Sequence, residues 1–202
     1  MSVLTGVTLL GRISSCLADQ PEPVVSILEK RHRHVVLQQW DLSCGAAALA
    51  TILNYQHGDS VTERKIALAM MGREEYIANP TVVTYRQGFS LLDLKRFVDA
   101  RGYAGTGLGQ LTLEHLVEHA PIIVPISVYG YQHFVVFRGM DRDRVLLADP
   151  AFGNRTMSRS RFERNWLTSP GLGHIGFYVQ RSDGLIPPDR LTPQASVRAT
   201  PR

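Results

Sequence analysis

Cysteine is scarce in this chain. Only Cys16 and Cys44 occur among its 202 residues. Two thiols cannot build a disulfide-stapled scaffold or a closed four-cysteine zinc site. A single cysteine that remains in a folded body is instead a candidate nucleophile.

Other absences narrow the class of protein further. No stretch approaches 18 consecutive apolar residues, so the sequence predicts no transmembrane helix. Repeats and low-complexity blocks are also absent, and 44% apolar with 20% charged residues is typical of a globular domain. The net charge is only +4, and much of the basic excess is arginine spread over 138–164 and the C-terminal tail. Because nucleic-acid binders usually cluster their basic residues on one element and add aromatics, we expect no nucleic-acid partner.

Residues 1–18 resemble a secretory signal peptide. The apolar run 3–11 is followed by a segment that ends on the small residue Ala18, and a polar, proline-rich stretch comes next. We therefore expect export to the periplasm and cleavage after Ala18. The segment 13–16 also resembles a lipoprotein cleavage box, which would place a lipid anchor on Cys16. The alternative is the frayed N-terminus of a cytosolic protein.

The rest of the chain divides into three predicted parts. Residues 19–33 have the composition of an extended arm, 34–182 of one folded domain, and 183–202 of a loose, proline-rich tail. Within the domain, helical patterns come first and short strands rich in Val, Ile, Phe and Tyr follow. Helices followed by antiparallel strands predict an α+β fold.

Two helix starts carry clear capping patterns. Ser60 with Glu63 three residues later predicts a capping box that opens a helix through residue 71. Ser90 predicts the N-cap of a helix that ends near Gly102. Upstream of both, residues 45–55 are Ala-rich and apolar on nearly all sides, which predicts a buried helix.

Cys44 lies directly before this buried helix. A helix N-terminus offers free backbone N–H groups and a positive dipole end, which favour thiolate over thiol. A free cysteine is more often an inert small apolar residue. The polar run 38–41 just before Cys44 makes that alternative weaker here.

A thiolate nucleophile needs a base and a group that orients the base. His133 opens the apolar run 133–137, and Asp149 ends the run 144–149. Two antiparallel strands joined near Asp141 would place His133 beside Asp149, whose carboxylate could then hold the imidazole in one tautomer. Alone, His133 is more simply interpreted as a structural histidine, and Asp149-Pro150 as a turn-forming pair.

Together these motifs resemble the bacteriocin-processing, double-glycine cysteine peptidases, cysteine peptidase family 39. The resemblance rests on Gln38 six residues before Cys44-Gly45, then AAALATILNY, His133-Phe134 and Asp149-Pro150, and it spans residues 35–178. It implies a papain-like fold with Cys44 as nucleophile, His133 as base, Asp149 as orienting residue and Gln38 as oxyanion-hole side chain. It implies no cofactor and no metal.

Gln39 competes with Gln38 for the oxyanion role. The two side chains of an extended segment point in opposite directions, so only one of them can serve. The spacing to Cys44 favours Gln38, and the adjacent glutamines leave a one-residue register error open.

The chain departs from the family pattern at two points. Ser43 stands where the family often has Asp, and typical members are the N-terminal domain of an ATP-driven exporter, which this sequence lacks. It is more similar to the stand-alone exported members encoded with secretion systems for functional amyloid (Fap) or pilus-like fibres. The expected substrate is therefore a secreted peptide or protein, cleaved at a small-residue site such as Gly-Gly, with secretion-system components as further partners. The alternatives are a papain-like acyl or peptidyl transferase and a catalytically silent chaperone or adaptor.

Four further patterns have less weight. His115 to His119 spell H-x-x-E-H, a zinc-peptidase pattern, but no third ligand is evident and the short helix ends at Pro121, so we expect a solvated face. Tyr129 and Tyr131 could wall a narrow cleft, and 72–89 could form a lid. The last pattern is a set of arginines that could attract an acidic substrate but more simply form a solvated face: Arg155, Arg159, Arg161 and Arg164.

Overall fold

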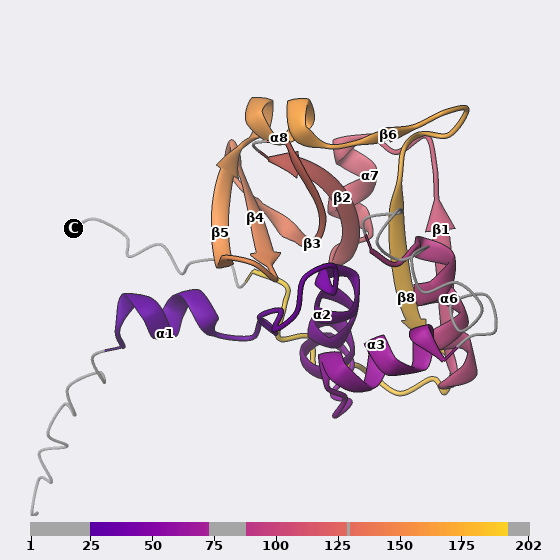
Figure 1. Cartoon of the computed structure of the whole chain (residues 1–202). Helices are drawn as coiled ribbons and strands as arrows, with labels where there is room; N and C mark the ends of the chain where they lie inside the picture. Colours follow the sequence, from indigo (N-terminus) through magenta and orange to yellow (C-terminus); the bar gives the residue numbers. More distant parts are fainter. Residues whose placement is uncertain (1–24, 73–87, 129, 194–202) are drawn as a thin grey trace, which may run out of the picture.

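The computed structural model describes residues 25–72, 88–128 and 130–193 (Figure 1). Helices come first along the chain, and a six-stranded antiparallel sheet dominates the second half, which confirms the predicted α+β class. The helices are α1 (Ile27–His32), α2 (Cys44–Thr51) with its π-helical extension η1 (Ile52–Gln56), α3 (Glu63–Met71), α6 (Leu91–Ala100), α7 (Leu113–Glu118) and α8 (Arg159–Asn165).

The main sheet has the strand order β1-β8-β2-β3-β4-β5. Two-residue connections join β2 to β3 and β3 to β4, so these strands form consecutive hairpins. A small second sheet pairs β6 (Thr168–Ser169) with β7 (Gly173–His174). The bounds of the main strands are β1 (Tyr103–Leu108), β2 (Ile122–Val128), β3 (Tyr131–Asp141), β4 (Arg144–Asp149), β5 (Gly153–Ser158) and β8 (Gly176–Arg181).

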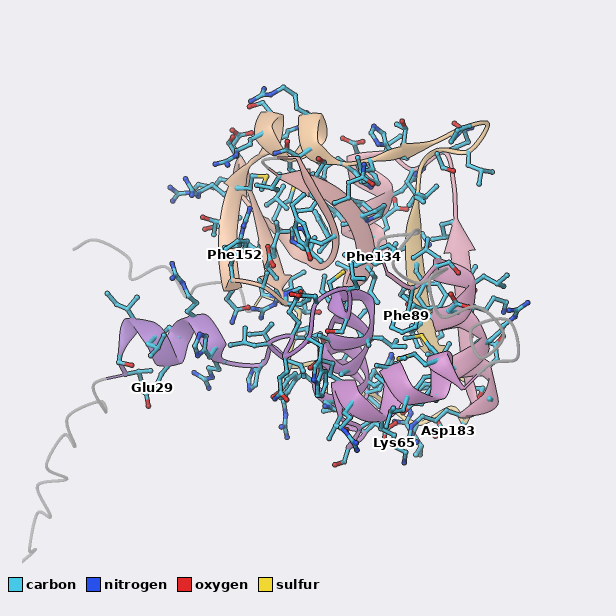
Figure 2. All side chains as sticks on the ribbon, in the orientation of Figure 1. Glu29, Lys65, Phe89, Phe134, Phe152 and Asp183 are labelled. Carbon is cyan, nitrogen blue, oxygen red and sulfur yellow. The ribbon has the colours of Figure 1, made fainter. Side chains whose placement is uncertain are left out.

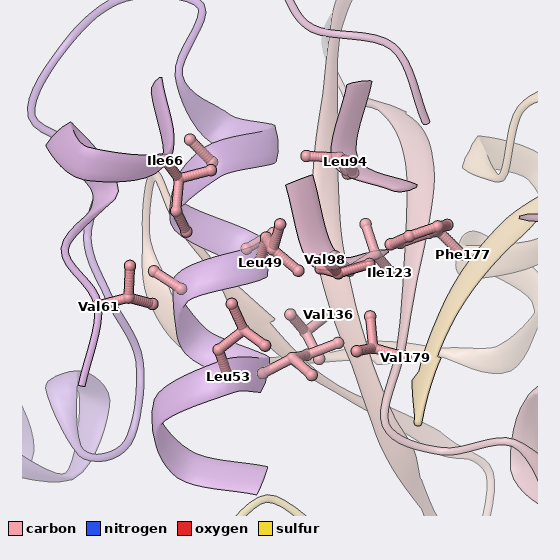
Figure 3. Packing of buried hydrophobic residues seen from close by; sticks show 14 of the residues in the cluster. Leu49, Leu53, Val61, Ile66, Leu94, Val98, Ile123, Val136, Phe177 and Val179 are labelled. Carbon is pink, nitrogen blue, oxygen red and sulfur yellow. The ribbon is translucent and has the colours of Figure 1, made fainter. Parts of the chain in front are cut away.

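The two faces of the sheet build two hydrophobic cores. Ile123 and Val136 face the cluster that also contains Leu49 of α2, Ile66 of α3 and Leu94 of α6 (Figure 3). Strand alternation sends the neighbouring residues to a second cluster beneath α7 and α8. Each fully buried aliphatic side chain contributes about 1.5–3 kcal/mol through burial, so the sheet is stabilised from both sides.

Helix α2 runs through the first core. Every residue from Cys44 to Thr51 is buried, and small alanines let α2 lie close to the sheet. The Thr51 hydroxyl donates to the Ala47 carbonyl at 2.9 Å, which satisfies the one polar side chain at its end. The helix ends at Gln56, followed by His57 as C-cap and by Gly58 at a φ of +74°.

The predicted start of α3 is wrong by two residues. The N-cap is Thr62, whose hydroxyl accepts from the Lys65 N–H at 3.2 Å, and not Ser60. The predicted N-cap of α6 is confirmed, because Ser90 and Asp93 form a reciprocal capping box. Besides α1, four elements were not predicted: β1, β5, β6 and α8. None of them carries a run of large apolar residues, so their conformation depends on neighbours in space.

The predicted arm and tail are more ordered than their composition suggests. Residues 27–32 form α1, with a Ser26–Glu29 capping box, where the sequence predicted an extended segment. Leu191 is fully buried, and the Arg190 N–H donates to the Tyr55 carbonyl at 3.1 Å. The prediction of a loose tail is therefore wrong for the segment around Leu191. The predicted signal peptide lies outside the described residues, as do most of 72–89 and the tail beyond 193.

None of the helices in the described ranges is long and apolar enough to cross a lipid bilayer.

Candidate active site

Cys44 is the first residue of α2 and lies where this helix meets the sheet. Its side chain is buried, and Sγ accepts from the Phe134 backbone N–H at 3.5 Å. Figure 2 labels Phe134 at this junction. Burial raises the pKa of the Cys44 thiol, although the backbone N–H groups of Phe134 and Gly45 lower it. The expectation that the helix N-terminus favours the thiolate is therefore outweighed by desolvation in the resting site.

His133 and Asp149 meet on adjacent strands, as the spacing predicted. His133 Nε2 lies 3.3 and 3.2 Å from the two carboxylate oxygens of Asp149, and both side chains are buried. The turn at Arg142-Asp143 joins β3 to β4 and sets this register. The other ring nitrogen, Nδ1, is also buried and has no hydrogen-bond partner within the described residues. One nitrogen of the ring is thus held by a carboxylate while the other is open.

Asp149 is itself held from two further sides. Its Oδ1 accepts from the Ala151 N–H at 2.9 Å, and its Oδ2 lies 3.2 Å from Arg155 Nη1. The Arg155 guanidinium also lies 5.3 Å above the Phe152 ring. The sequence interpretation placed Arg155 on a solvated face, which is wrong, because its side chain is only 20% exposed and pairs with the buried carboxylate. Arg159 instead pairs with Glu163 and Glu114 on the surface.

The two glutamines before Cys44 have different surroundings. Gln38 is half-buried, with Nε2 3.4 Å from the Trp40 carbonyl and a buried Oε1 that has no partner in the described part of the chain. Its backbone N–H donates to the Pro150 carbonyl at 2.9 Å, which ties it to the residue after Asp149. Gln39 is exposed. Gln38 is therefore the more buried of the two, and it is also the residue that the spacing to Cys44 favoured.

Glu63 is a residue of this region whose position the sequence did not predict. Its buried carboxylate accepts from the Gln39 N–H at 3.0 and 3.1 Å and from the Ser43 hydroxyl. It thus holds both ends of the loop that carries Gln38 toward Cys44. Glu63 was interpreted as the partner of Ser60 in a capping box, and nothing in its spacing indicates that it turns inward.

Tyr131 and an apolar cavity complete the surroundings. The Tyr131 ring stacks on the His133 ring at 5.2 Å. Burial and the neighbouring Cys44 raise the pKa of Tyr131, while a hydrogen bond from Gln38 lowers it. Beside the thiol lies a cavity of about 270 Å³ whose lining includes Cys44, His133 and Phe89. Tyr129, the other predicted cleft residue, lies outside the described residues.

The two histidines of the H-x-x-E-H pattern form hydrogen bonds with backbone groups of their own helix and its N-cap. His115 Nδ1 accepts from the Thr112 N–H at 3.2 Å, and His119 Nδ1 lies 2.9 Å from the His115 carbonyl. Across the described ranges, no three or more His, Cys, Asp or Glu side chains are grouped closely enough to hold a metal ion.

Comparison with known proteins places this chain in a known family. Residues 32–169 match the model of the peptidase C39 family. A probable functional amyloid protease, FapD, of Pseudomonas aeruginosa is 37% identical over 172 residues, which cover 84% of this chain and 73% of that protein. The protein of the same description from Pseudomonas fluorescens is 38% identical over 145 residues, covering 71% of this chain and 61% of its own length.

Solved structures share the fold. A double-glycine-motif protease from an AMS/PCAT transporter, in complex with its leader peptide, superimposes with a TM-score of 0.57 at 23% identity. That match covers 73% of this chain and 91% of the solved chain. A putative C39-like peptidase from Bacillus anthracis gives a TM-score of 0.53 at 18% identity, covering 73% and 94% of the two chains. The chain therefore belongs to the peptidase C39 family and is a cysteine peptidase with a papain-like fold.

Proposed function

We propose that Cys44, His133 and Asp149 form the catalytic triad of this peptidase, with Gln38 as oxyanion donor. The observation that carries the proposal is the buried His133–Asp149 pair, in which His133 Nδ1 has no partner among the described residues and so leaves one ring nitrogen to accept a proton. The thiol of Cys44 accepts from the N–H of Phe134, the residue next to His133, so the two side chains belong to one site.

The reaction begins when Nδ1 of His133 takes the thiol proton and Sγ of Cys44 bonds to the scissile carbonyl carbon. Asp149 stabilises the imidazolium that forms. The oxyanion accepts from the Gln38 amide and the Cys44 backbone N–H, and such a donor is typically worth about 10²–10³ in turnover. His133 then gives its proton to the leaving amine as the C–N bond breaks, which leaves a thioester.

Water completes the cycle. His133 removes one proton from the water molecule while its oxygen bonds to the thioester carbon. The S–C bond then breaks, the carboxylic acid product leaves, and the proton returns to Cys44. A transferase would use an amine in place of this water, so the mass of the product distinguishes the two reactions.

The substrate that we propose is a protein secreted through a fibre or functional-amyloid system in the periplasm. Support comes from the two Pseudomonas relatives described as probable functional amyloid proteases and from the signal-like residues 1–18. The thiol is only 3% exposed, and Tyr131 and Phe134 lie beside it, so a backbone with small side chains, such as Gly-Gly, fits best.

The experiment compares the purified wild-type protein with Cys44→Ala on candidate secreted fibre proteins, using mass spectrometry of the products. We expect cleavage with gain of one water by the wild type, and loss of cleavage in Cys44→Ala and His133→Ala with unchanged circular dichroism. Equal cleavage by Cys44→Ala would refute the assignment. A product that carries an added amine would identify a transferase instead, and an unreactive thiol would favour the adaptor alternative.

A further inference from the structure

A second cavity, of about 400 Å³, lies between the N-terminal arm, strands β3 and β5, and the tail segment around Leu191. It shares no lining residue with the cavity beside Cys44. Four of its lining residues are cationic at neutral pH, whereas Asp189 is the only carboxylate among the described residues that line it. The residues that matter here are Lys30, Arg33, His34, Arg138, Asn154 and Arg190.

Arg138 is the central group of this cavity. It is the extra residue of a β-bulge between Phe137 and Gly139, and such bulges redirect a side chain out of the regular alternation. Its Nε donates to the Leu191 carbonyl and its Nη1 to Asn154 Oδ1, both at 2.8 Å. Both acceptors are neutral, and Arg138 forms no ion pair with any carboxylate of the described ranges. Burial lowers the pKa of this guanidinium, because water is partly removed from its charge.

The cations around Arg138 come from separate segments that are held in place. Asn154 Nδ2 donates to the carbonyls of Lys30 at 3.2 Å and Arg33 at 2.6 Å, which fastens the arm to β5. Arg190 is held by its backbone bond to Tyr55. Burial, followed by the charges of Arg33, Arg138 and Arg190, lowers the pKa of His34. The cavity therefore has a positive field that the fold maintains.

We propose that this cavity is a binding site for a phosphate group. Arginine presents a planar fork of donors that matches phosphate oxygens, and several cations that line one cavity favour a multiply charged anion. The Asp189 carboxylate is exposed and accepts from the Thr192 N–H, and among the described residues it forms no ion pair with Arg138. The phosphate can belong to a free small molecule or to a lipid headgroup, since the same contacts serve both.

The test measures binding of inorganic phosphate and pyrophosphate to the full chain by calorimetry and thermal unfolding, at constant ionic strength. We expect saturable binding, and a rise of roughly 5–10 °C in the unfolding midpoint at about 100 times the dissociation constant. A parallel arm measures flotation with phosphatidylglycerol vesicles and with pure phosphatidylcholine vesicles.

A double variant, Arg33→Ala with Arg190→Ala, removes two exposed cations of the cavity. Its matched control, Arg64→Ala with Lys65→Ala, removes two exposed cations of α3. We expect the first to weaken phosphate binding about tenfold or more and the second to change it less than twofold. Arg138→Gln should abolish binding, and the double variant still decides the matter if Arg138→Gln does not fold.

The outcomes of these experiments distinguish a small-molecule phosphate from a lipid headgroup. Binding of soluble phosphate or pyrophosphate, lost in the double variant alone, supports a small-molecule site. Selective flotation with phosphatidylglycerol, lost in the same variant, supports a headgroup site. No binding in either arm, an equal loss in the control variant, or binding of a glutamate-rich peptide in place of phosphate would overturn the proposal.

Discussion

Replacing Asp149 with asparagine tests how the carboxylate orients His133. Each oxygen of Asp149 faces a donor besides His133: Oδ1 accepts from the Ala151 N–H at 2.9 Å, and Oδ2 forms an ion pair with Arg155 Nη1 at 3.2 Å. An asparagine keeps only one oxygen, so its NH₂ group must face one of these two donors. The same change removes the charge that stabilises the imidazolium of His133.

The size of the effect follows from the geometry. A unit charge 3.2 Å from His133 Nε2 corresponds to about 5 kcal/mol at an effective dielectric constant of ~20, which is an upper bound because Arg155 offsets part of it. We therefore expect kcat to fall by about 10²–10⁴, equivalent to roughly 3–5 kcal/mol, with little change in KM. The buried donor that loses its acceptor should lower the free energy of unfolding by about 1–3 kcal/mol.

The assay measures kcat and KM on a peptide that the wild type cleaves, together with urea unfolding of the same preparations. Asp143→Asn is the matched control, because it makes the same chemical change at an exposed turn between β3 and β4. If Asp149→Asn unfolds more easily but keeps kcat within threefold of the wild type, Asp149 is a structural residue and the orienting role is refuted.

Three further predictions concern other residues. Gln38→Ala should lower kcat by about 10²–10³ while Gln39→Ala stays near the wild-type value, and a larger loss at Gln39 would reverse the assignment. Glu63→Ala should lower kcat because the loop that carries Gln38 loses its acceptor, and Glu63→Gln should restore part of it; equal kcat values in all three proteins would contradict this positioning role. The bidentate Arg101 pair lowers the pKa of Asp59 to about 2. Its stabilisation is therefore complete above about pH 4 and lost as pH falls toward 2, so Asp59→Asn should cost at most about 2 kcal/mol at pH 7 and less at pH 3 in urea unfolding. An undiminished difference at pH 3 would contradict it.

Much of the candidate site could be predicted because local signals and hairpin geometry agree. His133 and Asp149 are 16 residues apart on two strands joined by a short turn, which brings them together at the open ends of those strands. Cys44 precedes a helix whose apolar composition required burial. These features depend on short-range patterns that a single sequence carries.

The remaining features depend on contacts between distant segments. The inward turn of Glu63 depends on how α3 packs beside Ser43, and its spacing fits a capping box equally well. Leu191 is one apolar residue in a proline-rich segment, so its sequence context does not indicate that it is buried in the core. The pKa of Cys44 reflects a balance between dipole and desolvation that burial decides.

The central claim is that His133 takes the proton of the buried Cys44 thiol, and the rate of Cys44 alkylation by iodoacetamide between pH 6 and pH 9 tests it most directly. Because burial raises the pKa of this thiol, an isolated Cys44 would react slowly near neutrality. The wild type should remain reactive at pH 6.5 because His133 accepts the thiol proton as Sγ attacks, and His133→Ala should react about a hundredfold more slowly there and recover only as pH rises. Equal alkylation profiles for the wild type and His133→Ala would contradict the account.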